Sequence, residues 1–503
     1  MNRPLPIIYQ GHRAKGLNPD YAARKFAEDT RRRALRGTLA LQVLRHLKCI
    51  IRVNFRPYDP SQPYILPQSL DDWLPEGHLA RFISDTVDNL DLTEFYKYYR
   101  ANGQGSSAYH PRMMVKVLLY AYCVGVCSSR KIARALVDDV AFRWLGAGNF
   151  PDFRTISEFR RKHLKAFQGL FSQVLVLCKV AGLLKVGVVA LDGTKVKANA
   201  SLSKNRTYDQ LLKEEEEINK KVKELLDRAE KTDQEEDELY GDMRGDELPP
   251  ELSNRKSRLK KIREAKAELE ARSKAKAAEQ KTRNKEQKSG KEKRGGKSKD
   301  SSAKPDGRSR INTTDFDSRV QKTKGGYIQG YNAQAVVNED QVIIAQTVVS
   351  DENDIHQLIP MVEQTEETLK ELGESPKTFL ADAGYCSNDN FLKVENKDYE
   401  VLVPTKAERK QRTESGGSIR GRKPDSARAR MERKLKNPVR AFVYGFRSRM
   451  IEPVFGQMKF CRGLKGFLLR GLEKVQGEFS MWCTSHNLLK LFRNQGIARV
   501  SIE

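Results

Sequence analysis

Three acidic side chains stand at positions from which they could act together on a phosphate group, and two of them directly follow short apolar runs. Asp192 follows the run 186–191, and Asp382 follows the run 378–381. Sites in open α/β sheets form at the carboxyl ends of strands, so neighbouring strands would bring these carboxylates together. Such a pair repels unless a cation lies between its members, and Mg²⁺ prefers oxygen ligands. The pattern therefore predicts a metal site at one edge of a sheet.

Glu452 is the best candidate for a third acid, which two metal ions would need. Glu452 and Lys459 are seven residues apart, so on a helix they would share one face, two turns from each other. A carboxylate and a lysine on one face could bind metal and backbone phosphate together. Pro453 suits the first turn of a helix, which would place Glu452 near the helix start.

The elements that must position these residues read as a mixed α/β domain. The run 186–192 is almost wholly apolar and predicts a strand buried on both faces, whereas the alternation over 327–337 predicts a half-buried strand. Further strands are expected at 341–349, 378–382 and 401–404. Helices are expected over 354–372, where Asp354 would cap the helix, and over 440–494.

The segment 53–180 reads as an all-α domain. Its turn at 146–151 leads into a basic helix over 152–165 that contains Arg154, Arg160 and Arg161. Two short helices around a tight turn suit a helix-turn-helix-like DNA reader, and an ordinary helical bundle with a solvated basic face is the alternative. The net charge favours DNA.

The segment before this domain, 1–52, is basic and poorly patterned. Globular character starts abruptly at Val53, and a Val codon can serve as a start codon in some organisms. We therefore hypothesise that 1–52 is an upstream extension that the native protein lacks.

A charged insertion, 203–311, divides the α/β domain into 185–202 and 312–494. Residues 204–253 contain 9 basic and 17 acidic residues, and residues 254–310 contain 22 basic and 8 acidic residues. We expect one or two helices in the first part and a disordered basic linker from Lys281 onward. Such blocks are commonly solvated, and an arm that grips phosphate is the other interpretation.

The composition of the whole chain of 503 residues points to a polyanionic partner. Lys and Arg number 92 against 66 Asp and Glu, for a net charge of +26, which makes nucleic acid the first expectation and an anionic membrane the second. No apolar stretch is long enough to span a bilayer, and no secretory signal is recognisable. We expect a cytoplasmic protein associated with the nucleoid.

The order of the three acids resembles the DDE triad of bacterial insertion-sequence transposases. Tyr444, Arg447, Glu452 and Lys459 resemble the Tyr-Arg-Glu-Lys signature of that class, although four residues rather than three separate Arg447 from Glu452, which leaves Arg449 as a substitute. Flanking motifs are similar to the subgroup with an InsH-like N-terminal helical domain. These include Tyr109-His-Pro, Leu191-Asp-Gly-Thr-Lys, Gln329-Gly-Tyr-Asn-Ala-Gln, Ala381-Asp-Ala-Gly-Tyr and Val454-Phe-Gly-Gln.

This resemblance implies a ribonuclease-H-like catalytic fold and metal-assisted phosphoryl transfer on double-stranded DNA. Asp192, Asp382 and Glu452 would hold two Mg²⁺ ions, for which Mn²⁺ is a plausible substitute, and Lys459 with Arg447 or Arg449 would hold phosphate. The enzyme would cut at terminal inverted repeats and join the freed 3′-hydroxyl to target DNA, as a homodimer on DNA. Two alternatives remain: a nuclease of the same fold that does not join strands, and a catalytically inactive repressor derived from a transposase.

Overall fold

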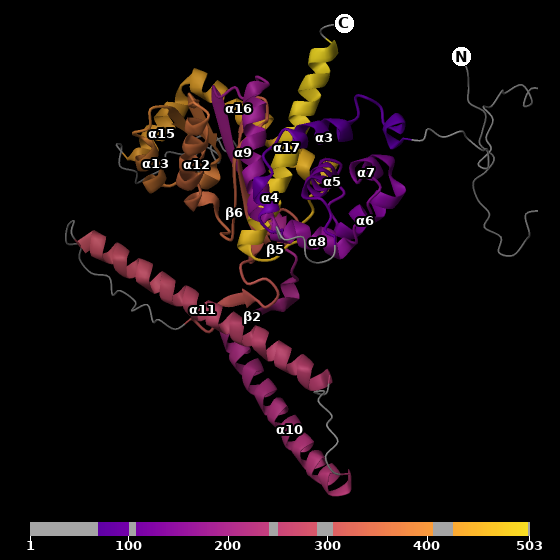
Figure 1. The fold of residues 1–503 in the computed structure, drawn as a ribbon. Helices are drawn as coiled ribbons and strands as arrows, with labels where there is room; N and C mark the ends of the chain where they lie inside the picture. Colours follow the sequence, from indigo (N-terminus) through magenta and orange to yellow (C-terminus); the bar gives the residue numbers. More distant parts are fainter. Residues whose placement is uncertain (1–68, 100–106, 241–249, 289–304, 406–425, 501–503) are drawn as a thin grey trace, which may run out of the picture. The chain divides into compact units, whose positions relative to one another are not determined.

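The computed structural model of the chain describes residues 69–99, 107–240, 250–288, 305–405 and 426–500. The hypothesised extension, 1–52, lies outside these residues. The described residues form a helical N-terminal region, a mixed sheet with further helices, and two long helices inserted within the sequence of the sheet (Figure 1). The expected combination of a helical N-terminal region with an α/β domain is confirmed.

The N-terminal region consists of short helices whose apolar sides face inward. They are η1 (Leu70–Trp73), α3 (Leu79–Asp88), α4 (Thr93–Tyr96), α5 (Pro111–Cys123), α6 (Ser129–Asp138), α7 (Val140–Leu145), α8 (Phe153–Lys162) and α9 (Leu164–Val180). Pro111 occupies the first turn of α5, where its missing N–H needs no partner. α8 begins after Asp152, whose carboxylate accepts a hydrogen bond from the Arg154 N–H at 2.7 Å. Within the described residues, no helix is both long enough and apolar enough to cross a bilayer.

The sheet joins segments from both sides of the insertion. Its strands are β1 (Val188–Lys197), β4 (Arg319–Thr323), β5 (Gly326–Asn338), β6 (Ile343–Val349), β7 (Thr378–Ala381) and β8 (Glu400–Leu402). The strand order is β4-β5-β1-β7-β8, and β6 also pairs with β5. β1 and β7 are parallel, as are β7 and β8, whereas the pairings of β5 with β1, β4 and β6 are antiparallel.

Two expectations about these strands are wrong. β5 is buried on both faces from Gln329 to its end rather than half-buried, because helices cover both sides of the sheet. β1 does not end at Asp192 but continues to Lys197, because its antiparallel pairing with β5 extends that far. The consequence for Asp192 is small, since the pairing of β1 with β7 ends one residue before it.

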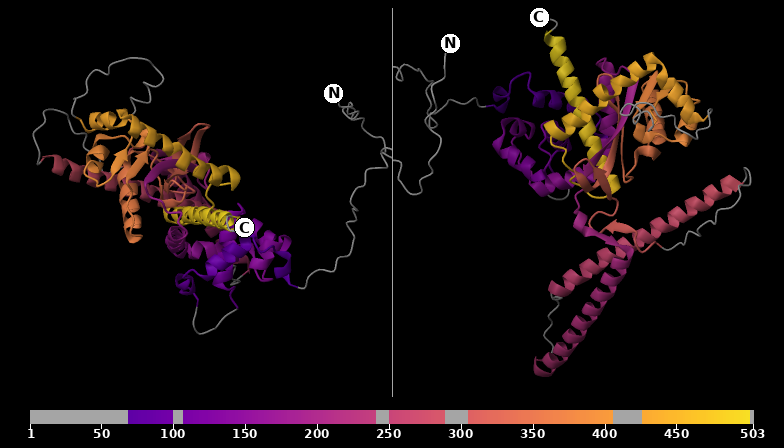
Figure 2. Two further views of the ribbon diagram at one scale, coloured as in Figure 1. Left: turned by 90° about the horizontal axis from the view of Figure 1, so that it is seen from above. Right: turned by 180° about the vertical axis from the view of Figure 1, so that it is seen from behind.

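Helices of the C-terminal half cover the sheet. They are α12 (Leu358–Glu371), α13 (Asn388–Val394), α15 (Ala427–Lys436), α16 (Pro438–Gly456) and α17 (Leu472–Val500). The sheet lies between α12, α13 and α15 on one side and α9 and α17 on the other (Figures 1 and 2). The predicted helix over 354–372 starts later than expected, at Leu358, and its first turn contains Pro360.

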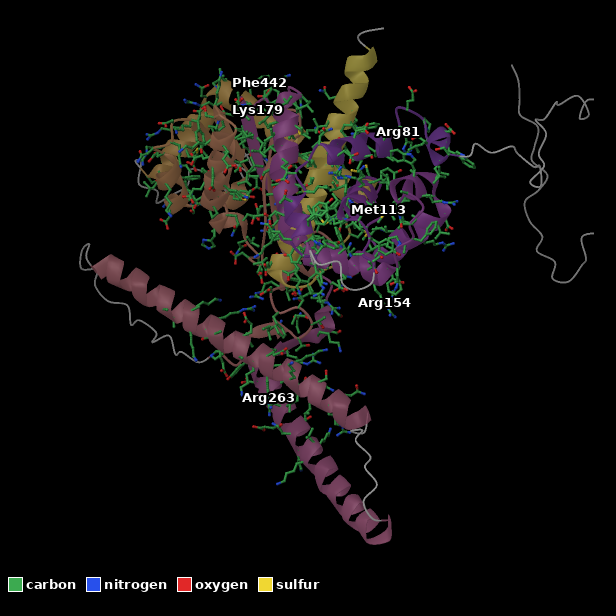
Figure 3. All side chains as sticks on the ribbon, viewed as in Figure 1. Arg81, Met113, Arg154, Lys179, Arg263 and Phe442 are labelled. Atoms are coloured by element: carbon green, nitrogen blue, oxygen red, sulfur yellow. The ribbon has the colours of Figure 1, made fainter. Side chains whose placement is uncertain are left out.

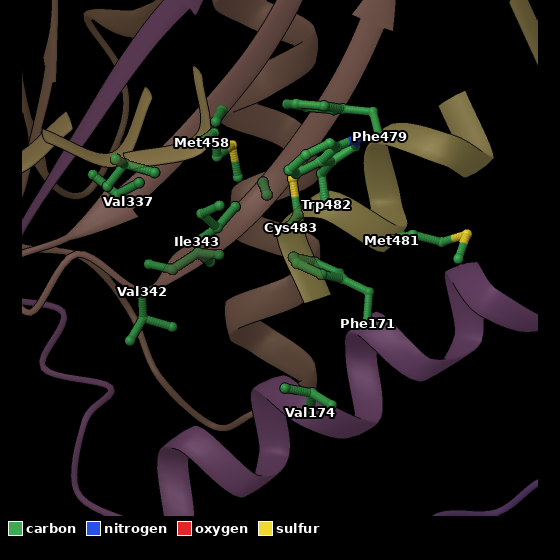
Figure 4. Packing of buried hydrophobic residues seen from close by; sticks show 14 of the residues in the cluster. Phe171, Val174, Val337, Val342, Ile343, Met458, Phe479, Met481, Trp482 and Cys483 are labelled. Carbon is green, nitrogen blue, oxygen red and sulfur yellow. The ribbon is translucent and has the colours of Figure 1, made fainter. Parts of the chain in front are cut away.

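α17 joins the helical region to the sheet in one hydrophobic core. It packs against α9, α5 and β6. Trp482 is only 2% exposed, and Figure 4 shows it and Cys483 on α17, between Ile343 at the sheet and Phe171 and Val174 of α9. Truncation of such a buried aromatic side chain costs roughly 3–5 kcal/mol. The sheet that carries the site residues therefore packs on a core to which the helical region contributes.

The insertion has a small core of its own. Its elements are η2 (Leu202–Lys204), β2 (Asn205–Thr207), α10 (Tyr208–Tyr240), α11 (Pro250–Lys288) and β3 (Arg310–Asn312). β2 and β3 pair antiparallel and so bring the two ends of the insertion together. Apolar residues of α10, α11 and β3 pack on one another: Leu211, Ile218, Leu259, Ile262, Ala265, Leu269 and Ile311. The expectation of disorder from Lys281 is wrong for the first residues of that stretch, because α11 continues to Lys288; residues 289–304 lie outside the described structure.

Candidate active site

Asp192 and Asp382 lie beside each other on adjacent parallel strands. Leu191 pairs with Ala381 in the register of β1 with β7, and each acid is the next residue of its chain. β7 ends at Ala381, and the carboxylate of Asp382 then accepts the Gly384 N–H at 2.6 Å, which starts the turn η4 (Ala383–Tyr385). The predicted meeting of two carboxylates at this sheet edge is therefore what the strand register produces.

The electrostatics of Asp192 reflect this crowding. Burial raises the pKa of Asp192 to about 6, the negative charge of Asp382 adds to the increase, and Arg447 opposes it. Two contacts favour the ionised form: the Gly193 N–H donates to Oδ1 at 2.8 Å, and Arg447 Nη1 lies 3.1 Å from Oδ2. The pKa remains raised despite them, so a carboxylate at this position gains from an additional cation.

α16 delivers the cationic partner. Arg447 contacts Asp192 through Nη1, and its Nη2 lies 3.8 Å from Glu452 Oε1, so the guanidinium stands between the two acids. The unusual spacing of Arg447 and Glu452 thus does not keep Arg447 from the site. Arg449, the predicted substitute, has an exposed side chain. Sequence spacing left these two arginines as alternatives, and the structure selects Arg447.

Pro453 does not begin a helix, contrary to expectation, but lies inside α16. A proline in a helix leaves the carbonyl four residues earlier without its usual donor. That carbonyl belongs to Arg449, and Gln341 Nε2 donates to it at 3.0 Å. A side chain from the β5–β6 connection therefore compensates for the proline, and Glu452 lies within the last two turns of the helix.

Lys459 reaches the site from a π-helical turn, η5 (Gln457–Cys461), that continues α16. Its Nζ donates to Thr194 Oγ1 at 2.5 Å and to the Lys195 carbonyl at 2.9 Å, which fixes it against β1 two residues beyond Asp192. Burial lowers the pKa of Lys459. Single π-helical turns are frequent at functional sites because they re-aim a side chain.

A fourth acid, Asp354, belongs to this neighbourhood and was assigned to helix capping from the sequence. That expectation is wrong, since Asp354 lies in the turn η3 (Asp354–His356), and its Oδ1 accepts from Asn332 Nδ2 at 2.6 Å and Gln334 Nε2 at 2.8 Å. Lys195 Nζ lies 3.5 Å from the same oxygen. The buried Tyr385 hydroxyl donates to Gln334 Oε1. Two of the three amides in the motif Gln329-Gly-Tyr-Asn-Ala-Gln, those of Asn332 and Gln334, contact Asp354, and such a run of amides within an apolar strand is the sequence signal for a buried polar partner.

Asp354 faces the backbone next to both predicted catalytic aspartates. A Cβ atom built on Gly193 would lie 2.8 Å from Asp354 Oδ1 and 2.3 Å from Gln334 Nε2. A Cβ atom on Gly384 would lie 3.4 Å from Asp354 Oδ2. Burial raises the pKa of Tyr385, and the charges of Asp354, Asp192 and Asp382 raise it further. The charges of three carboxylates therefore act on one buried tyrosine, whose hydroxyl is bonded to Gln334.

The three predicted metal ligands are not gathered into a metal centre. Within the described residues, no group of three or more His, Cys, Asp or Glu side chains is placed to hold a metal ion. Asp192 and Asp382 are adjacent, whereas Arg447 stands between Asp192 and Glu452, whose side chain is 61% exposed. The oxygen donors and the raised pKa of Asp192 nevertheless fit a hard divalent cation such as Mg²⁺.

The three arginines predicted to bind DNA from α8 differ in their surroundings. Arg160 is 3% exposed, and its guanidinium donates to the Cys127 carbonyl at 2.8 Å and to Ser129 Oγ at 3.2 Å. The expectation that Arg160 contacts DNA is therefore wrong, because its donors serve the helical core. Arg154, labelled in Figure 3, and Arg161 are both exposed. Together with Arg130 they line one groove.

Comparisons with known proteins give two matches. A family model described as "Transposase domain (DUF772)" matches residues 68–162, and one described as "Transposase DDE domain" matches residues 298–488. The second match contains Asp382 and Glu452, whereas Asp192 lies upstream of it, beyond the insertion. No curated protein and no solved structure matches the chain significantly.

Proposed function

The chain carries the two domains of a DDE-type insertion-sequence transposase, and from this premise we propose that it is the DNA transposase of a bacterial insertion sequence. In this proposal it binds terminal inverted repeats, cleaves DNA at the element's ends and joins the freed 3′-hydroxyl to target DNA. The observation that carries the proposal is the register that puts Asp192 and Asp382 side by side, with Arg447 linking Asp192 to Glu452.

The sheet topology supports a ribonuclease-H-like catalytic domain. Along the path β6-β5-β1-β7-β8, the first three strands pair with their neighbours antiparallel. These strands, β1, β5 and β6, also follow one another along the chain, apart from the insertion and β4. Two parallel strands, β7 and β8, follow on the other side of β1. We infer that Asp192 lies on the central strand of such a sheet, and that the insertion interrupts its first connection.

Asp192, Asp382 and Glu452 would hold Mg²⁺ in this proposal, with Mn²⁺ as a substitute. The bound ions would supply an activated water and a counter-charge for the leaving oxygen. Asp192, whose side chain is 22% exposed against 61% for Glu452, would be the more enclosed of these two ligands.

The cationic side chains of the site have separate tasks. Arg447 would hold the DNA phosphate that reacts at the site, since a guanidinium binds phosphate oxygens in a bidentate manner. Lys459 would contact the neighbouring phosphate from its fixed place at Thr194. Asp354, held by Asn332 and Gln334, would position the Gly193 and Gly384 backbone next to the two aspartates.

DNA outside the site would be bound by exposed basic side chains. Arg154 and Arg161 of α8 are the proposed contacts of the helical region, and Arg449 lies exposed on α16 near the site. Because transposition needs two element ends, we propose a homodimer on DNA that acts on the nucleoid in the cytoplasm. Phosphate contacts of this kind release counterions, so binding should weaken steeply as salt rises.

A cleavage assay tests the proposal. The substrate is a duplex that carries an end of the element, and wild type is compared with Asp382→Ala and with Asp398→Ala, an exposed acid outside the site. We expect Mg²⁺-dependent nicking at the element's end by wild type and Asp398→Ala and none by Asp382→Ala, with DNA binding retained by all three. Equal nicking by all three proteins would show that the assigned acids do not carry the reaction.

A further inference from the structure

A groove of about 620 Å³ lies at the base of the insertion, away from the residues assigned above. We call it the root groove; its lining includes Leu202, Arg206, Arg310, Val320 and Tyr327. η2, β2 and β3 contribute one side and the β4–β5 hairpin the other. No acidic residue lines the groove in the part of the chain that the structure describes.

The root groove combines an exposed aromatic ring, Tyr327, with a lining cation, Arg310, that is unpaired among the described residues, and Lys322 lies beside its lining residues on β4. Tyr327 is 63% exposed and Leu202 is 42% exposed, so both present apolar surface to solvent at the groove. Lys322 is directly opposite Tyr327 in the register of β4 with β5, so both point to the same face of the hairpin. Among the described residues, Arg310 and Lys322 are exposed and have no carboxylate partner.

Two acids near the groove are paired with other cations. Arg206 pairs with Glu214 at 2.6 Å, and Arg258 also approaches that carboxylate, at 3.3 Å. Asp317 is paired with Arg272 at 3.3 Å. Glu214 and Asp317 therefore do not neutralise Arg310 and Lys322, which are left to attract an anion. A ring that can stack and two cations that can hold phosphates together match a nucleic-acid strand.

The root groove also lies in line with the proposed active site. Ala335 pairs with Asp192, and Tyr327 precedes Ala335 by eight residues on the same strand, β5. An even separation puts both positions on one face of the sheet, although Gln329, Tyr331 and Ala333 between them are buried, so a bound strand would have to pass over the residues that cover them. At about 3.3 Å per residue the two positions are about 26 Å apart along β5.

We propose that the root groove binds one strand of the DNA substrate, with a base stacked on Tyr327 and the adjoining phosphates held by Arg310 and Lys322. The inference rests on the proposed function for the identity of the substrate, and it adds a second DNA contact built from the insertion and the β4–β5 hairpin.

The test measures the binding of the full-length protein to a single-stranded oligonucleotide that contains 2-aminopurine, whose fluorescence falls on stacking. Tyr327→Ala should weaken binding about fivefold or more, the lower end of the cost of losing one base–aromatic stack, and should abolish the fluorescence change. Tyr327→Phe retains the ring and should behave as wild type. Arg310→Glu should weaken binding, whereas Lys393→Glu, the same charge change on exposed α13, should not.

Cleavage by the same preparations separates this inference from the proposed function. Unchanged binding and fluorescence in Tyr327→Ala and Arg310→Glu, with wild type still cleaving DNA, would overturn the root groove alone. Lost binding in both variants without any cleavage by wild type would support the groove and contradict the transposase. A change in self-association of the variants on ultracentrifugation, without a change in DNA binding, would make the groove a protein interface and overturn the proposal.

Discussion

Replacement of Asp192 by Asn should stabilise the protein in a manner that depends on pH. The pKa of Asp192 is about 6 in the folded protein against 3.8 for an ordinary Asp, because the carboxyl is buried and stands beside Asp382. A raised folded-state pKa means that the folded state binds more protons than the unfolded state between these values. The protonated Asp192 carboxyl therefore makes its full contribution to the unfolding free energy below about pH 4. This contribution is lost as the pH rises through about 6.

The size of the effect follows from the shift. Roughly two pKa units correspond to about 3 kcal/mol of unfolding free energy, and the limited exposure of the side chain, 22%, calls for only a modest discount. The attraction of Arg447 is already contained in this pKa. An asparagine side chain cannot ionise. The unfolding free energy of Asp192→Asn relative to that of wild type should therefore rise by about 2–3 kcal/mol from pH 4 to pH 7.5.

Guanidinium unfolding of both proteins at these two pH values, without divalent cations, measures the gain. Titrating groups distant from Asp192 contribute equally to both proteins and cancel in the difference. Asp398→Asn, an exposed replacement, serves as the control and should show no gain. If the difference in unfolding free energy between Asp192→Asn and wild type does not change with pH, burial and the charge of Asp382 do not destabilise the ionised form of Asp192.

Five further replacements test the roles of the site, the buried polar network and α8. Arg447→Ala should lower single-turnover DNA cleavage at least about a hundredfold, whereas Arg449→Ala should change it only a few-fold, because only Arg447 contacts Asp192. Gly193→Ala should lower the unfolding midpoint, since the added methyl group would overlap the buried polar network at 2.3 Å. Arg160→Ala should destabilise the fold by roughly 2–4 kcal/mol in a denaturant titration, since the buried acceptors lose their donor. Arg154→Ala should leave stability unchanged and weaken DNA binding in an anisotropy titration; equal loss of stability in both arginine variants would contradict their assigned environments.

Much of the site could be predicted because its residues are marked by local patterns. Asp382 follows a short apolar strand, and the residues around it fix the turn that it caps. The sequence also pointed to Asp192, but not to its place within a longer strand, since that depends on pairing with β5 far along the chain. A short apolar run identifies a buried strand and says little about where its pairing ends.

The choice between Arg447 and Arg449 shows the limit of spacing arguments. On a regular helix with about 100° per residue, Arg449 lies about 60° from Glu452 and Arg447 about 140°, so spacing alone favours Arg449. The structure selects Arg447 because the face of α16 that meets β1 carries it to Asp192. Packing of the whole helix determines which of its faces meets the sheet. The spacing of three residues along the sequence does not give this information.

Asp354 and Arg160 were misjudged for a related reason. Asp354 precedes a helix and resembles a cap locally, but its partners Asn332 and Gln334 come from the central part of β5. Arg160 was counted with the exposed arginines of α8, although the periodicity that buries Ile156 also turns position 160 inward. In both cases a polar side chain is satisfied by distant buried partners, and neighbouring residues cannot reveal them.

The joining of a pre-cut DNA end tests the central claim most directly. A duplex that already ends in the 3′-hydroxyl of the element is incubated with plasmid DNA and Mg²⁺, and covalent joining is measured by gel. The account predicts joining by wild type and by Asp398→Asn, and none by Asp192→Asn, although all three bind the duplex. Joining by Asp192→Asn at the wild-type rate, or cleavage without joining by wild type, would contradict it.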